Sequence, residues 1–150
     1  MTKTYIHYGS TEFDRNRFQP IKNISHFSKP RGGLWASDIN AKFGWKDWND
    51  REHFRDCLES NSFKFKLKDS ANVLTIWNWA DVEKLPQQGG EPHRFANILG
   101  YYPDWEEAVK RGYDAVEVYI WDGRGTYDAL YGWDCDSILI LNPDVVITVD

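Results

Sequence analysis

The stretch GGLWASDINAKFGW, residues 32–45, contains two tryptophans, Trp35 and Trp45, ten positions apart, and each closely follows a glycine. Residues 33–37 are predicted to form a short strand, and a polar loop separates this strand from Trp45. Each indole brings a large apolar area that must be buried or can stack on a flat ligand. Taken alone, the stretch favours packing of both tryptophans in the core. Whether they also bind a flat ligand depends on the other segments of the chain.

Length and composition predict an ordinary globular domain with one unusual feature. The chain has 150 residues, which predicts a single domain over residues 1–150 with a core of its own. Apolar residues make up 41% and charged residues 27%, as is typical, whereas aromatic residues reach 16%. Part of this aromatic excess must lie in the core, and the remainder is available for a recognition surface.

Charge and cysteine content exclude several classes of protein. The formal net charge of −5 argues against non-specific binding to nucleic acid, which usually needs a basic face. Cys57 and Cys135 lie far apart and lack metal-ligand spacing, so we expect neither a disulfide framework nor a metal site. No apolar run is long enough to cross a bilayer. The expectation is a reduced, cytoplasmic protein that does not bind membranes.

Periodicity and turn signals predict many short strands and a few helices, which together indicate an α+β fold. Phe63, Phe65 and Leu67 alternate with lysines, as in a half-buried strand. Asp104 and Glu107 have the spacing of a capping box before a helix. The predicted strands are 4–8, 33–37, 61–69, 71–77, 113–121, 137–141 and 145–149, and the predicted helices are 45–58, 80–85 and 105–111.

Three segments carry the candidate chemistry: IHYGS at 6–10, GGLWASDINAKFGW at 32–45 and WDCDSILILNPDVV at 133–146. Taken singly, each has a structural explanation. A histidine in a short strand is more often structural than catalytic, and acidic residues before an apolar strand are usually an exposed strand entry. The order and spacing of the three segments are more informative than any one of them.

In order and spacing the segments resemble the ADP-ribosyltransferase superfamily, specifically its His–Tyr–Glu branch of diphtheria-like toxins and poly(ADP-ribose) polymerases. That branch has His, Gly and Ser or Thr on its first strand and a Gly-apolar-Tyr-small-Ser/Thr/Ala second strand. A further aromatic residue follows, and a late carboxylate opens an apolar strand. The matching residues here are His7-Tyr8-Gly9-Ser10, Gly33-Leu34-Trp35-Ala36-Ser37 with Trp45, and Asp136 before Asn142-Pro143.

The resemblance implies a small α+β fold of two packed, mainly antiparallel sheets with a few short helices. It also implies a mono-ADP-ribosyltransferase-like enzyme that uses NAD as substrate and needs no metal. Trp35 and Trp45 would sandwich the nicotinamide, and Asp136 would stabilise positive charge on the ribose. The NAD-binding residues so implied are His7, Tyr8, Gly9, Ser10, Gly33, Trp35, Ser37 and Trp45, with His7, Trp35 and Asp136 as the catalytic residues.

The sequence departs from the family pattern at three points. Tyr8 stands between His7 and Gly9, so Tyr8 is a candidate for the backbone contacts to the carboxamide. Trp35 and Trp45 replace tyrosines, which keeps stacking and loses a hydroxyl. Asp136 is one methylene shorter than the family's Glu, and such displacement can cost two orders of magnitude in rate. The alternative is therefore a weakly active or inactive domain that binds NAD, another nucleotide or a protein.

Further residues are candidates for handling the acceptor of ADP-ribose. Asp134 lies two positions before Asp136, where the arginine-directed branch has an acidic residue that orients the acceptor, and Arg124 lies in a loop suited to acceptor contacts. Glu117 is the second choice for the catalytic carboxylate, although its alternation with valines predicts a solvent-facing position. The acceptor, protein or nucleic acid, and the oligomeric state stay open. The size suggests a toxin-like effector of a phage or mobile element.

Overall fold

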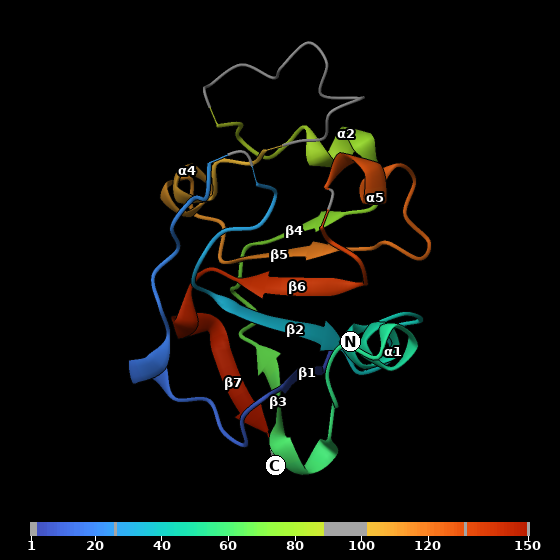
Figure 1. Cartoon of the computed structure of the whole chain (residues 1–150). Coiled ribbons are helices and arrows are strands. Elements are labelled where there is room, and N and C mark those ends of the chain that lie inside the picture. Colours follow the sequence, from blue (N-terminus) through green and yellow to red (C-terminus); the bar gives the residue numbers. More distant parts are fainter. Residues whose placement is uncertain (1–2, 26, 89–101, 131, 150) are drawn as a thin grey trace.

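A computed structural model describes residues 3–25, 27–88, 102–130 and 132–149 (Figure 1). In these ranges the strands are β1 (Tyr5–Tyr8), β2 (Leu34–Asp38), β3 (Ser62–Leu67), β4 (Val73–Ile76), β5 (Ala115–Val118), β6 (Ser137–Ile140) and β7 (Val146–Val149). The helices are α1 (Trp45–Glu52), α2 (Trp79–Val82), α4 (Trp105–Lys110) and α5 (Thr126–Ala129), with short 3-10 turns η1 (Arg15–Arg17), η2 (Glu59–Asn61) and η3 (Pro143–Val145). The predicted α+β class is confirmed.

The strands of the described ranges form one mixed sheet in the order β4-β5-β6-β2-β1-β3-β7. Strands β4 and β5 pair in parallel, and the other neighbours pair antiparallel. The expectation of two packed sheets is not confirmed. A short ladder, in which Tyr5 pairs with Asp38 and Ile6 with Ser37, joins β1 to β2 and makes the sheet continuous.

Strand β6 lies inside this sheet and is buried on both faces. Ile138 and Ile140 belong to one core cluster together with Phe65 of β3. Leu139 points the other way, into a second cluster that includes Trp105. Because successive side chains of a strand alternate between faces, an apolar run such as SILIL is what a strand covered on both sides requires.

A bend in the sheet creates the first of these clusters. In Figure 1, β3 and β7 run at a steep angle to β4, β5, β6 and β2. Phe65 of β3 and Ile138 of β6 nevertheless share one cluster, so the two halves of the sheet face each other across it. One bent sheet thus buries the apolar surface that we expected two separate sheets to bury.

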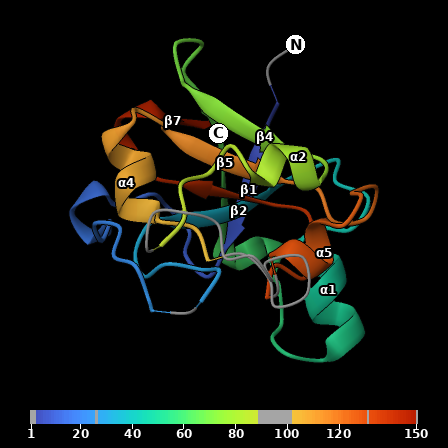
Figure 2. The ribbon, with the colours of Figure 1, turned by 90° about the horizontal axis from the view of Figure 1, so that it is seen from above.

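Helices α2, α4 and α5 cover the second cluster and surround the β4–β5 end of the sheet (Figure 2). The predicted cap of α4 is present, because the Asp104 carboxylate accepts the N–H of Glu107 at 3.0 Å. Trp105, the first residue of α4, is fully buried. This helix therefore begins where the sequence predicts and ends one residue earlier, at Lys110.

Helix α1 is shorter than predicted. The spacing of apolar residues favours a helix over 45–58, but α1 ends at Glu52, and His53 adopts a left-handed conformation with φ of 53°. A left-handed residue is a common way to end a helix. Residues 54–57 then turn back beside α1, which places them at the pocket described below.

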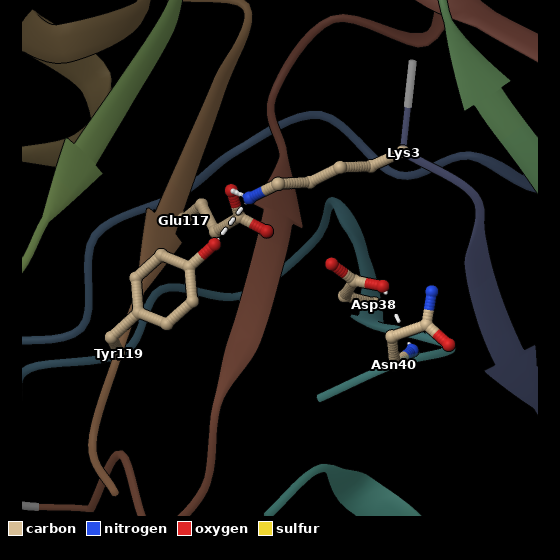
Figure 3. Close-up of polar contacts among 5 residues, drawn as sticks. All are labelled: Lys3, Asp38, Asn40, Glu117 and Tyr119. Carbon is tan, nitrogen blue, oxygen red and sulfur yellow. Dashed lines mark hydrogen bonds and ion pairs between the residues drawn. The ribbon is translucent and has the colours of Figure 1, made fainter. Parts of the chain in front are cut away.

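A partly buried ion pair joins Lys3 to Glu117 of strand β5 (Figure 3). The Lys3 ammonium lies 2.9 Å from a carboxylate oxygen of Glu117, whose side chain is 7% exposed, and also donates to the hydroxyl of Tyr119. Nearby, Asp38 accepts the N–H of Asn40 at 2.9 Å and stabilises the turn after β2. The predicted solvent-facing position of Glu117 is wrong, because the bend of the sheet covers that face of β5.

We expect Lys3→Met to lower the free energy of unfolding by about 1–2 kcal/mol, because it leaves the Glu117 carboxylate buried without its cation. The loss of stability stays small because the Lys3 side chain is 41% exposed. Chemical denaturation measures it as a change in the free energy of unfolding. Lys22→Met, a change at an exposed lysine, should cost less than about 0.5 kcal/mol. Equal losses in the two variants would show that the ion pair does not stabilise the fold.

Candidate functional site

A pocket with a cavity volume of about 390 Å³ lies where β1 and β2 meet α1. Its lining includes His7, Tyr8 and Gly9 at the end of β1, Trp35 of β2 and Trp45 at the start of α1. These residues come from two of the three segments singled out in the sequence. Antiparallel pairing of β1 with β2 brings the two segments side by side.

Three residues implied as NAD contacts, Ser10, Gly33 and Ser37, lie outside this lining. Gly33 has a φ of 75°, and a Cβ there would come within 2.7 Å of the Leu139 side chain, so glycine is needed for packing against β6. The Ser37 hydroxyl accepts the N–H of Trp45 at 3.0 Å, which fixes the start of α1. The Ser10 hydroxyl reaches the carbonyl of Glu12 at 3.4 Å.

Asp136, the predicted catalytic carboxylate, also lies outside the lining. It is 6% exposed, and its Oδ1 accepts the N–H groups of Ile120 at 2.7 Å and Trp121 at 3.0 Å. Buried carboxylates need such donors, and these two tie the strand entry before β6 to the end of β5. In this arrangement Asp136 stabilises the fold of the loop after β5.

Asp134 and Arg124, predicted to contact the acceptor, and Glu117, the second choice for the catalytic carboxylate, lie in different surroundings. Asp134 is half-buried, and its negative charge acts on the ammonium of Lys29, which lines the pocket. Arg124 is exposed beside α5, and its N–H donates to the carbonyl of Trp77 at 2.8 Å. Glu117 is engaged with Lys3, away from the lining of this pocket. Of these three residues, Asp134 is the one that acts electrostatically on the pocket.

His7 is held in one tautomer. Its Nδ1 lies 2.6 Å from the carbonyl oxygen of Trp35, and because a carbonyl only accepts, Nδ1 must carry the proton. In the neutral ring, Nε2 then has a free lone pair, and it lies near Gly9. Burial lowers the pKa of His7 below its ordinary value of 6.5, with the bond to Trp35 acting in the opposite direction.

The two tryptophans are in contact but are not parallel. Their ring centroids are 6.4 Å apart and the ring planes cross at 83°. Trp35 also packs against buried Trp133, with centroids 4.7 Å apart. The Lys29 ammonium lies 5.3 Å from the Trp35 ring and 5.5 Å from the Trp45 ring. In this conformation a lysine, rather than open space, lies beside both indoles.

Sequence reasoning missed part of the lining, namely Lys29 and Pro30, Asn49 of α1, and residues 54–57. Asn49 follows Trp45 by four residues on α1, so helical periodicity could have found it. Nothing local marks Lys29, whose position depends on contacts far along the chain. Two polar atoms here, Trp45 Nε1 and Asn49 Oδ1, are buried and have no hydrogen-bond partner among the described residues.

No family model, curated protein or solved structure matches this chain. Among the described residues, no cluster of His, Cys, Asp and Glu side chains is arranged to hold a metal ion. Within the same ranges, no helix combines the length and the apolar character needed to span a membrane.

His7 should make stability depend on pH. Because its pKa is lowered in the folded state, the unfolded chain binds a proton first as the pH falls below 6.5, so the free energy of unfolding decreases. The contribution is at most about 1.4 kcal/mol per pH unit. Urea denaturation of His7→Gln should show a shallower loss of stability between pH 7 and pH 5 than the parent chain. Identical slopes would contradict the buried, neutral state of His7.

Proposed function

We propose that this chain binds NAD in the pocket beside β1, β2 and α1 and transfers its ADP-ribose to a protein or nucleic-acid acceptor. The observation that carries the proposal is the meeting of His7 with Trp35 and Trp45 in one cavity. These are the residues to which the resemblance to ADP-ribosyltransferases assigns NAD. A single aromatic pocket with a few polar groups is also the usual form of a small-molecule site.

The proposed reaction breaks the bond between nicotinamide and the ribose carbon. Nicotinamide leaves as a neutral base with the electron pair of that bond, and positive charge develops on the ribose. The acceptor nucleophile adds to the same carbon and loses its proton to solvent. Such chemistry needs little acid or base catalysis, and it depends on a firm grip on the nicotinamide and a nearby negative charge.

His7 and Tyr8 are suited to orient the NAD. The free lone pair of His7 Nε2 can accept a hydrogen bond from a ribose hydroxyl. The N–H of Gly9 is already donated to the carbonyl of Asn61 at 2.9 Å, so backbone contacts to the carboxamide fall to Tyr8. Gly9 itself, with a φ of 116°, serves the turn after β1.

Rotation of the Trp45 ring would prepare the nicotinamide site. The rings now cross at 83°, whereas a sandwiched ring needs parallel faces. A carboxamide offers both an acceptor and donors, the complement of the unpaired Trp45 Nε1 and Asn49 Oδ1. Because both atoms are covered in the present conformation, the same rotation that aligns the rings has to expose them.

Two aspartates are candidates for stabilising the charged ribose. Asp136 is the one that the resemblance implies, and its Oδ2 accepts no hydrogen bond from the described residues. Asp134 is the one whose charge acts on the pocket through Lys29. We assign to Asp134 or Asp136 the negative charge that stabilises the ribose cation. Separate variants of the two residues show which carboxylate acts.

Nicotinamide release from NAD tests the reaction. Replacement of the catalytic aspartate, in Asp134→Asn or Asp136→Asn, should slow release by about 10²–10³ while the near-identical shape preserves the fold. Trp35→Ala should weaken NAD binding about tenfold through lost stacking. Asp128→Asn, at an exposed position on α5, is the matched control and should behave as the parent chain. Undiminished release by both aspartate variants would remove these carboxylates from the mechanism.

Binding of NAD without turnover is a second candidate function. The observation that favours it is the engagement of the Asp136 carboxylate with two backbone N–H groups outside the pocket lining. A domain of this kind would hold NAD and leave its glycosidic bond intact.

Calorimetry and tryptophan fluorescence separate the two functions. If the chain only binds, titration with NAD should give heat and quench the emission of Trp35 and Trp45, with no nicotinamide released over hours. Trp35→Phe should keep most of the binding and show altered quenching. Absence of both heat and quenching would exclude NAD as the ligand and overturn both functions.

A further inference from the structure

Lys29 is one of two cationic residues that line the pocket. It belongs to the segment before β2, where the carbonyl of the preceding Ser28 accepts N–H bonds from the indoles of Trp105 and Trp133. Its ammonium lies 5.3 Å from the Trp35 ring and 5.5 Å from the Trp45 ring. The backbone anchor and the two rings together direct this side chain into the cavity.

The ammonium of Lys29 has no ion-pair partner among the described residues. Asp134 is the acidic residue whose charge acts on it most strongly, yet no carboxylate of the described ranges lies within ion-pair distance. Burial lowers the pKa of Lys29 below its ordinary value, with the charge of Asp134 acting in the opposite direction. Aromatic faces attract a cation but accept none of its three N–H groups as a carboxylate or phosphate oxygen does.

Other charged groups face the same cavity. Arg55 lines it, stacks over the Phe54 ring at 5.1 Å and likewise makes no ion pair within the described residues. Asp56 and the neutral ring of His7 complete the titratable lining besides Tyr8 and Cys57. The lining itself thus holds two unpaired cations and one carboxylate, a positive excess that suits an anionic group, while Asp134 acts on Lys29 from outside the lining.

We propose that Lys29 binds the phosphate group attached to the nicotinamide ribose, so that the pocket selects phosphorylated nicotinamide nucleotides over the nucleoside. This inference rests on the proposed function, namely that the pocket takes NAD. It adds a specificity-determining residue that lies outside the three sequence segments.

On ligand binding, the Lys29 ammonium would exchange the two indole faces for the phosphate of the ligand. The nicotinamide ring of NAD carries a positive charge, so it competes with the Lys29 ammonium for the faces of Trp35 and Trp45. When the ring enters, the ammonium has to leave those faces. The flexible four-carbon stem of lysine allows it to move, and the phosphate of the same ligand offers it a stronger partner.

The test compares nicotinamide mononucleotide, which carries the phosphate, with nicotinamide riboside, which does not. In calorimetry the parent chain should bind the mononucleotide more tightly. Lys29→Gln should weaken binding of the mononucleotide at least about tenfold and should not weaken that of the riboside, for which it only removes a competing ammonium. Lys29→Arg, which keeps the charge, should retain most of the preference. Lys22→Gln, at an exposed lysine outside the pocket, is the matched control.

Three results would overturn the inference. One is equal affinity of the parent chain for the two ligands. Another is an equal loss for both ligands in Lys29→Gln, which would give Lys29 a packing role against the ring. The third is loss of the preference in Lys29→Arg when thermal melting shows that this variant is folded.

A further arm with ADP-ribose keeps the two proposals distinguishable, because this probe has phosphates and no nicotinamide. Binding of ADP-ribose that is lost in Lys29→Gln, with no binding of NAD or either nicotinamide ligand, would overturn the proposed function. The same result would overturn the nicotinamide selectivity inferred here and would show Lys29 only as a contact for the phosphates of ADP-ribose. The inference alone fails if NAD binds but the mononucleotide is not preferred to the riboside. If none of the four probes binds, both proposals fail.

Discussion

One backbone carbonyl holds together the parts of the chain that build the pocket. The oxygen of Ser28 accepts the indole N–H of Trp105 at 3.0 Å and that of Trp133 at 3.1 Å, and both indoles are at most 1% exposed. Buried indoles need such acceptors, and here one acceptor serves α4 and the segment before β6 together. The loop that carries Lys29 and Pro30 is therefore fixed by the core and lies beside β2.

The same tryptophans connect core and pocket through ring contacts. Trp105 stacks on Trp133 at 5.8 Å, Trp133 packs on Trp35 at 4.7 Å, and Trp35 meets Trp45 at 6.4 Å. Core packing and ligand binding, the two roles that the aromatic-rich sequence left open, are thus compatible. The interior indole of Trp133 packs against Trp35, while Trp45 at the start of α1 contacts Trp35 and Trp48. Trp105, Trp133, Trp35 and Trp45 thus form one continuous set of ring contacts from the core to the pocket.

Local patterns predicted the elements whose environment is simple. Alternation found β3, where Phe63 and Phe65 are buried between lysines, and the spacing of Asp104 and Glu107 found the start of α4. The same reasoning failed at Glu117, because alternation assumes one free face and the bent sheet covers both faces of β5. Lys29 had no signal at all, since its place depends on indoles more than seventy residues further along the chain. Long-range contacts of this kind are absent from any window of sequence.

Asp134 and Asp136 lie two residues apart before β6, yet the structure directs them to different partners. Residues two apart share a face only within a strand, and β6 begins at Ser137, after both of them. Asp136 therefore turns toward the N–H groups that follow β5, while Asp134 acts on Lys29. Strands β1 and β2 with α1 shape the pocket, whereas the proposed catalytic carboxylates lie at the entry to β6. In the proposed reaction, binding and bond cleavage would therefore depend on different elements, so a chain of this architecture could lose turnover and still bind NAD.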